Sequence, residues 1–432
     1  PPKVLGENTP SNPSMVAAEQ HFSEEVSELL HGELLFSRSE FELEGIELEL
    51  LPALRGMYAR DGEIPEGVSP RLELSIRLPR TGLQRAVEAL PPELVGPFEG
   101  IEIGGTAAWD MYLEVPLDRI ADMNWIAETE LEGFEVRKIP AGLNVFLLNG
   151  EFCYAPEGFT ATTPAPLRIP EPRPTPIEWM RRHSELPFGS IRLLRERAEH
   201  SPDPPEILET DGADSSLSSC NGRRYDRSYR YVYLEQMAPH LPLAVITAED
   251  GDFFFHDGIN WLTIRHAIES NLLAGEIETG GSTITMQLVK NLFLSKNRSL
   301  RRKLHEAALV YLIEHYARIP KERILEIYLN IADFGPGIRG VSEACRYYFG
   351  KSPSQIDPVE AVWLASILPS PRKYHRYFEA GKLSRGWWIR MHSYLELMHE
   401  RGRLSDEEYR RAMRRSSLFG NYAGEGKSAG SE

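Results

Sequence analysis

The spacing of apolar residues changes along the chain from period two to a helical period. Between Phe41 and Tyr154 apolar and polar residues mostly alternate, for example at Leu72, Leu74, Ile76 and Leu78, as in strands with one polar face. A helix is expected over residues 83–90. Asn149-Gly150, between two short apolar runs, predicts a hairpin turn. After Leu241 the apolar residues recur every three to four positions, which predicts helices. The pattern therefore favours an α+β protein with a β-rich N-terminal domain and a mainly helical second domain.

The local amino-acid composition predicts where the domains and linkers begin and end. The predicted parts are a β-rich domain (1–163, with a flexible start at 1–13), a proline-rich linker and polar loop (164–224), a helical domain (225–415) and a disordered tail (416–432). Residues 383–400 predict one further helix, and Ser405 with Glu408 predicts a capping box that opens a last short one.

Charge and cysteine content narrow the class of protein. The net charge of −16 argues against a nucleic-acid partner. Basic residues nevertheless gather between residues 290 and 323, where they can bind an anionic group. Three cysteines can close at most one disulfide. The sequence contains no apolar run of about 18 residues and no signal-peptide pattern.

Five short motifs follow one another between Glu249 and Lys351. They are E-D-G-D-F-F-F-H-D-G (249–258), G-G-S-T-I-T-M-Q (280–287), R-K-L-H-E (302–306), K-E-R-I-L-E-I-Y-L-N (321–330) and R-G-V-S-E-A-C-R-Y-Y-F-G-K (339–351). In this order they resemble the peptidoglycan glycosyltransferases of family 51, which are lysozyme-like enzymes that polymerise lipid II into glycan strands. The resemblance covers about residues 225–400. It departs from the family at Met286, where many members carry Gln.

The first motif supplies the candidate base. The resemblance implies that Glu249 is the general base, and the residues agree, because Glu249 ends an apolar run in which partial burial raises a carboxyl pKa. The alternative is a solvated glutamate at a helix end. Asp250 and His256 are expected to orient neighbours and to shape the loop.

The second motif predicts the start of a helix. The free N–H groups of a helix start form an anion site, which Gly280 and Gly281 leave open to close approach. The resemblance places phosphate and sugar contacts here, at Ser282, Thr283 and Gln287. The alternative is an ordinary capped helix.

The third motif places two cations beside a carboxylate. Arg302 and Lys303, together with Lys290, suit a pyrophosphate, and Glu306 can position them or share a metal. The resemblance suggests one candidate cofactor, a divalent metal ion (Mg²⁺ or Mn²⁺). Glu306 is the expected second carboxylate of a lysozyme-like pair, more than roughly 6.5 Å from Glu249 as in an inverting site. The alternative is a solvated helix face with a weak ion pair.

The last two motifs supply fewer candidates. Lys321, Asn330 and Arg339 are expected to contact substrate, whereas the remaining motif residues resemble core. The aromatic residues around Phe253–Phe255 and Trp261 form either a membrane-touching flap, as the resemblance implies, or a buried cluster. Ser370 to Lys373 fits S-x-x-K without the other transpeptidase motifs, so no transpeptidase is expected.

Together these features predict an enzyme in which Glu249 deprotonates the acceptor's 4-hydroxyl and undecaprenyl pyrophosphate leaves with inversion. Expected partners are lipid II, the growing glycan strand and the membrane surface. Envelope or cell-wall synthesis proteins are expected at the N-terminal domain, where residues 100–117 resemble AsmA-like lipid-binding proteins or form a plain spacer. The expected location is the periplasmic face of the cytoplasmic membrane, through an N-terminal anchor that this chain lacks. The rival hypotheses are a lysozyme-type hydrolase and a non-catalytic scaffold.

Overall fold

The computed structural model describes residues 34–35, 39–43, 46–55, 71–117, 119, 122–154, 167–173, 206–208, 217–218, 230–274, 280–294, 299–415 and 418. Contacts divide the chain into two compact units. Unit 1 is Pro1–Glu93, Ile103–Val136 and Glu269–Glu278, and unit 2 is Leu94–Glu102, Arg137–Ile268 and Thr279–Glu432. These units interleave along the chain, whereas the predicted domain bounds are consecutive. The predicted flexible start and almost all of the predicted tail lie outside the described residues.

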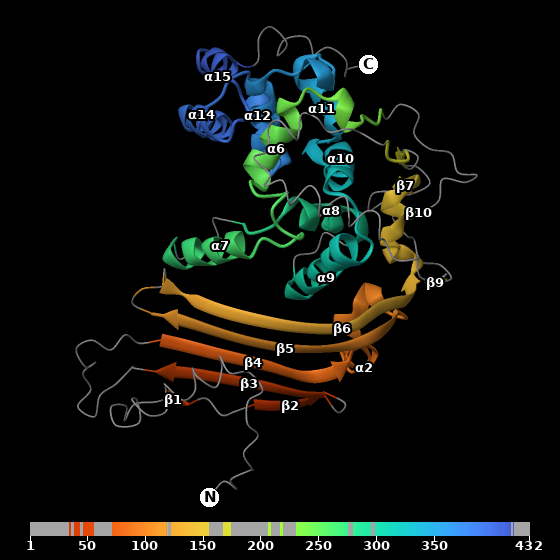
Figure 1. Ribbon diagram of the computed structural model, residues 1–432. Coiled ribbons are helices and arrows are strands. Elements are labelled where there is room, and N and C mark those ends of the chain that lie inside the picture. The colour runs from red at the N-terminus through yellow and green to blue at the C-terminus, as the bar shows by residue number, and fades with distance from the viewer. Residues whose placement is uncertain are drawn as a thin grey trace, which may run out of the picture. The chain divides into compact units, whose positions relative to one another are not determined.

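Long strands that run side by side form one sheet (Figure 1). The strands are β1 (Leu34–Leu35), β2 (Ser39–Leu43), β3 (Ile46–Arg55), β4 (Arg71–Gly82), β5 (Glu102–Pro116), β6 (Asn124–Pro140) and β9 (Glu206–Leu208). Their order is β1-β3-β4-β5-β6-β9, and β2 pairs with β3. The pairs from β1 to β5 are antiparallel, whereas β6 and β9 are parallel.

The register of β4 on β5 explains the alternating pattern. Leu74 lies opposite Leu113, whereas Arg77 lies opposite Asp110, and the Arg77 Nε donates to Asp110 Oδ1 over 2.8 Å. Leu72, Leu74 and Ile76 thus meet apolar residues across the two strands and Arg77 meets an opposite charge, whereas Glu73 lies opposite Glu114. The predicted strand at residues 72–78 is confirmed. The predicted helix after it is also confirmed, as α2 (Leu83–Glu88), followed by α3 (Pro92–Val95) and η1 (Gly96–Phe98).

The hairpin predicted at Asn149-Gly150 is wrong. Residues Val145–Asn149 form a 3-10 helix, η4, after a first one, η3 (Ala141–Leu143). Val145 and Leu148 are both buried, so the apolar spacing here is three residues and not two. The strand β7 (Phe152–Tyr154) instead pairs with β8 (Leu167–Ile169), inside the range predicted as linker, and with β10 (Leu217–Ser218).

The second half of the chain is helical, as predicted. Its helices are η5 (Leu234–Gln236), α6 (His240–Glu249), α7 (Trp261–Ala274), α8 (Ile284–Phe293), α9 (Leu300–Tyr311), the π-helix η6 (Leu312–Tyr316), α10 (Lys321–Ile331), α11 (Val341–Phe349), η7 (Pro353–Gln355), α12 (Pro358–Ile367), α13 (Pro371–Glu379), α14 (Arg385–Glu400) and α15 (Asp406–Met413). A small hairpin, β11 (Asp333–Gly335) with β12 (Ile338–Arg339), follows α10. The predicted capping box at Ser405 is present.

The core of unit 2 is built around α12. All residues of α12 from Val359 to Ile367 are buried, as expected for a helix that is apolar on every side. It lies beside α6 and also contacts α14 (Figure 1). The core therefore holds α6 from Leu241 to Ile246, and Glu249 lies at the end of this buried helix.

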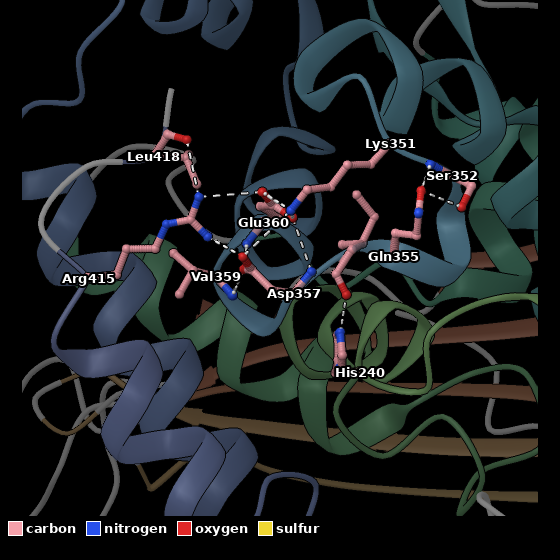
Figure 2. A network of polar contacts seen from close by, with 10 residues as sticks. His240, Lys351, Ser352, Gln355, Asp357, Val359, Glu360, Arg415 and Leu418 are labelled. Carbon is pink, nitrogen blue, oxygen red and sulfur yellow. Dashed lines mark hydrogen bonds and ion pairs between the residues drawn. The ribbon is translucent and has the colours of Figure 1, made fainter. Parts of the chain in front are cut away.

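A polar network closes the start of α12 (Figure 2). Asp357 caps the helix by accepting from the amides of Val359 and Glu360, both over 3.0 Å. Glu360, which is buried, accepts from Lys351 Nζ at both oxygens over 2.8 Å. Arg415 pairs with Asp357 and lies 3.4 Å from Glu360. This network joins the segment after α15 to the helix that supports α6.

Strands near the N-terminus and helices after residue 240 make this an α+β protein. Within the described residues no helix combines the length and apolarity that crossing a bilayer requires. Cys153 is disulfide-bonded and Cys345 is a free, buried thiol. Cys220 lies outside the described residues.

Candidate active site

Glu249 has the properties of a base near neutral pH. Burial raises its pKa to about 7, although a hydrogen bond from Gln287 and the charge of Lys290 act in the opposite direction. Its Oε2 accepts from Gln287 Nε2 over 2.7 Å. Its Oε1 is buried and accepts no hydrogen bond from any described residue. A carboxyl with a pKa close to the working pH and one unengaged oxygen is suited to accepting a proton.

Gln287 connects Glu249 to a tyrosine of α10. Its amide oxygen lies 3.0 Å from the hydroxyl of Tyr328, which donates to it. Tyr328 is buried, and burial raises its pKa well above the ordinary value, with further contributions from Glu249 and Asp250. The phenol therefore stays protonated and remains a donor.

Asp250 and His256 shape the loop that follows α6. Asp250 Oδ2 accepts from the backbone N–H of Ile284 over 3.0 Å, and Asp250 Oδ1 lies 2.8 Å from His256 Nε2. His256 Nδ1 accepts from the backbone N–H of Gly258 over 3.1 Å. His256 therefore carries its proton on Nε2 and donates it to Asp250. These contacts join the loop to the first residue of α8.

Two arginines beyond the predicted site hold the turn next to Glu249. Arg401 Nη1 and Arg403 Nη2 both donate to the carbonyl of Gly251, over 2.7 and 3.1 Å. Arg403 Nη1 also donates to Thr247 Oγ1, two residues before Glu249, over 2.6 Å. Burial lowers the pKa of Arg403 to about 10. The sequence motifs end before these residues, so only the structure connects them to the site.

The start of α8 is capped as expected. Thr283 Oγ1 accepts from the amide of Met286 over 3.2 Å and donates to the carbonyl of Gly258 over 2.6 Å. A Cβ on Gly281 would lie 2.9 Å from Ile264 Cα, so only glycine fits this approach of two backbones. Because Asp250 and Thr283 engage two amides of the helix start, fewer N–H groups remain for an anion than the motif predicts.

Cations surround the second carboxylate. Glu306 is 1% exposed; its Oε2 accepts from Lys303 Nζ over 2.6 Å, and Arg302 Nε lies 3.0 Å from its Oε1. Lys303 Nζ also donates to Ser282 Oγ over 2.9 Å. The structure thus brings Ser282, Arg302, Lys303 and Glu306 together, as the motifs suggested. We call these four residues the cation cluster.

Lys290 connects the cation cluster to Glu249. Burial lowers the pKa of Lys290; Glu306 raises it, the cations Arg302 and Lys303 lower it, and Glu249 raises it. Lys290 therefore interacts electrostatically with both carboxylates. Three cations around one buried carboxylate leave an excess of positive charge, which suits a pyrophosphate group.

The donor set does not fit a resident divalent metal. Both oxygens of Glu306 face cationic side chains, whereas Mg²⁺ and Mn²⁺ require oxygen ligands of their own. Among the described residues no group of three His, Cys, Asp or Glu side chains is arranged to hold an ion. We therefore derive no step through a metal.

Three other predicted residues make contacts inside the protein. Lys321, 2% exposed, donates to Glu314 Oε1 over 2.7 Å, and Thr285 Oγ1 donates to the same oxygen over 2.5 Å. Asn330 is also buried and pairs with the N–H and C=O of Val232. Arg339 Nε lies 3.4 Å from Asp333 in the small hairpin. Their contacts to substrate stay predictions.

The aromatic segment divides into buried and exposed residues. Phe253 and Phe254 are buried, whereas Phe255, Trp261 and Leu262 are 52%, 56% and 67% exposed. Lys321 Nζ lies 4.5 Å from the centre of the Phe253 ring. The first two residues thus belong to the core, and the last three form an apolar surface.

Comparison with known proteins gives the family. A family model described as Transglycosylase matches residues 215–399. A biosynthetic peptidoglycan transglycosylase of Azoarcus sp. (strain BH72) is 41% identical over 181 residues, which are 41% of this chain and 75% of the relative. A protein of the same name from Methylobacillus flagellatus is 39% identical over 189 residues (43% of this chain, 80% of the relative). One from Bordetella pertussis is 44% identical over 160 residues, which are 36% of this chain and 65% of the relative.

The matched range contains Glu249, Gln287, Lys290 and the whole cation cluster. A carboxyl of raised pKa near grouped cations is suited to transferring a group away from an anionic leaving group. At this identity and coverage, the chain belongs to the transglycosylase family and is a glycosyltransferase.

Proposed function

We propose that this chain polymerises lipid II into glycan strands, with release of undecaprenyl pyrophosphate and without a transpeptidase activity. The observation that carries the proposal is the pairing of Glu249, with its raised pKa and unengaged Oε1, with the cation cluster through Lys290. Membership of the transglycosylase family and the names of the relatives support the same reaction.

In this mechanism Glu249 Oε1 accepts the proton of the acceptor's 4-hydroxyl. The resulting oxygen nucleophile forms a bond to the anomeric carbon of the donor, and the bond from that carbon to the pyrophosphate oxygen breaks. The electron pair leaves on the pyrophosphate, where Arg302, Lys303 and Lys290 stabilise the developing charge. Attack opposite to the leaving group inverts the anomeric configuration. A lysozyme-like arrangement of unit 2 is part of this proposal.

We also place the reaction at the periplasmic side of the cytoplasmic membrane. The exposed Phe255, Trp261 and Leu262 provide apolar contact for an interface, where aromatic side chains are favoured. The disulfide of Cys153 supports an oxidising compartment. An N-terminal anchor would hold the chain there, and the strands of unit 1 are proposed to contact other envelope or cell-wall proteins.

The test is to incubate the purified chain with lipid II in detergent and to resolve the products by gel and mass spectrometry. We expect glycan ladders, with one undecaprenyl pyrophosphate released for each glycosidic bond that forms. Shortening of preformed glycan strands, with no polymer from lipid II, would replace the proposal by a hydrolase. No change in either substrate would favour the scaffold.

A further inference from the structure

Three side chains from three helices form a chain of directed hydrogen bonds that ends on the base. The hydroxyl of Tyr328 in α10 donates to Gln287 Oε1 in α8 over 3.0 Å. Gln287 Nε2 donates to Glu249 Oε2 at the end of α6 over 2.7 Å. The remaining oxygen of Glu249 is buried without a hydrogen-bond donor from the described residues. The two oxygens of the carboxyl therefore have different environments.

A glutamine amide can turn over, exchanging its oxygen and nitrogen. With its nitrogen toward Glu249 it stabilises the carboxylate, whereas with its oxygen toward Glu249 it stabilises the protonated acid. A hydroxyl that donates to Gln287 Oε1 favours the first orientation and polarises the amide, which strengthens its N–H as a donor. The orientation of Gln287 thus controls how much of Glu249 is in the basic form.

We propose that Tyr328 is a positioning residue for Glu249: its hydroxyl fixes the Gln287 amide, which holds Oε2 and leaves Oε1 as the single proton-accepting atom. The proposal rests on the proposed function for its catalytic meaning, whereas the hydrogen-bond chain itself does not. It gives Gln287 an orienting role instead of the substrate contact that the motif suggests.

Other ionisable groups also face Glu249. Asp250 lies next to it, Lys290 lies on α8, Tyr328 on α10 and Tyr394 on α14. Burial raises the pKa of both tyrosines, so neither titrates near pH 7. A change in the titration of Glu249 when only the Tyr328 hydroxyl is removed therefore reports on the hydrogen-bond chain.

The experiment is a carbon-13 NMR titration of glutamate side-chain carboxyls, in which the Glu249 signal is assigned by its loss in Glu249→Gln. We expect Tyr328→Phe to raise the pKa of Glu249 by about one unit, the order of a hydrogen bond to a charged group. Gln287→Leu should raise it further. The double variant should match Gln287→Leu alone, because Tyr328 acts through Gln287.

The acidic limb of the pH–rate profile for polymerisation should shift to higher pH together with the pKa of Glu249. For Tyr328→Phe we expect a loss of about tenfold at pH 6 and a rate close to wild type at pH 9. The matched control is Tyr348→Phe, which removes another buried hydroxyl, one that donates to the carbonyl of Phe334 over 2.7 Å. It should lower thermal stability without moving the pKa of Glu249.

An unchanged pKa of Glu249 in folded Tyr328→Phe would overturn the proposal. Shifts of the single variants that add up in the double variant would also overturn it. The NMR titration needs no turnover, so it decides the proposal even if the wild-type chain fails to polymerise lipid II, a result that would overturn only the proposed function.

Discussion

At the scale of the residue, the raised pKa that suits Glu249 to the proposed role of base also lowers the stability of the folded protein. Its pKa is about 7 in the folded protein against an ordinary value of 4.5. Between pH 4.5 and pH 7, Glu249 has lost its proton in the unfolded chain but keeps it in the folded protein. Stability therefore falls as pH rises from 4.5 to 7, and the full penalty is present above pH 7.

This penalty predicts that removing the charge stabilises the protein. Glu249→Gln should have a higher melting temperature than wild type at pH 8 and an equal one at pH 4, where both side chains are neutral. Gln287 can still donate to the new amide oxygen. Thermal melts at the two pH values measure the difference; a difference independent of pH would show that Glu249 does not titrate as described.

Glu306 is expected to act by holding cations. In Glu306→Gln the Lys303 ammonium and the Arg302 guanidinium lose their buried counter-charge. We therefore expect the donor pyrophosphate to be held less well, so that KM for lipid II rises more than kcat falls. Steady-state kinetics measure the two constants. The matched control is Glu407→Gln, which breaks an exposed ion pair with Arg411 and should change neither. A fall in kcat alone would contradict a binding role.

Some of these residues could be predicted from the sequence and some could not. Glu249, Lys303 and Glu306 lie in motifs, and a spacing of three along a helix already places Lys303 beside Glu306. Tyr328 lies 41 positions from Gln287, and no local pattern predicts a hydrogen bond over that separation. Glu314 was missed as the partner of Lys321 because it lies in η6 whereas Lys321 begins α10, so spacing within one helix does not predict the pair.

At the scale of the element, one arginine of α10 joins the helix to three backbone carbonyls that lie far from it in the sequence. Arg323, 3% exposed, donates to the carbonyls of Leu148, Gly150 and Pro170 over 2.8, 3.0 and 2.8 Å. It also pairs with Glu326 over 3.0 Å. The three carbonyls precede the range that matches the transglycosylase model. Unit 2 therefore depends on residues outside the part shared with its relatives.

We expect Arg323→Met to lower the free energy of unfolding by about 3–5 kcal/mol, because it removes the buried counter-charge of Glu326 and leaves three carbonyls without this donor. The control is Arg411→Met in α15, an exposed pair that should change stability by less than about 0.5 kcal/mol. Urea unfolding followed by circular dichroism measures both. Equal small effects would mean that α10 does not need this contact.

Long elements with a regular spacing of apolar residues could be predicted from the sequence, whereas short elements could not. The long strands and the helices after residue 240 follow from their apolar spacing, and so does the cap of α15. The 3-10 helix at Val145–Asn149 was predicted as a strand because five residues are too few to separate a period of two from a period of three. Its conformation depends on burial of Val145 and Leu148, which is a tertiary effect.

At the scale of the whole molecule, a net charge of −16 coexists with the local group of cations formed by the cation cluster and Lys290. Only nearby charges act strongly on a pyrophosphate, because the Debye screening length between exposed charges is about 8–10 Å at ordinary salt concentrations. Lys290 interacts electrostatically with Arg302, Lys303 and Glu306, so in the proposed reaction the pyrophosphate meets these cations while the charges of distant glutamates are screened. The net charge argues against a nucleic-acid partner, but only the motifs predicted this local group of cations.

The most direct test of the account is the rate of lipid II polymerisation by Glu249→Gln at neutral pH. A general base contributes about 10²–10⁴ in rate, so we expect a loss of that size with donor binding retained. Glu322→Gln is the matched control, because burial also raises the pKa of Glu322. Its charged neighbour is Lys321, and among the described residues no hydrogen bond or ion pair links it to Glu249 or to the cation cluster, so it should polymerise at close to the wild-type rate. Near-normal polymerisation by Glu249→Gln would contradict the central claim that Glu249 is the base.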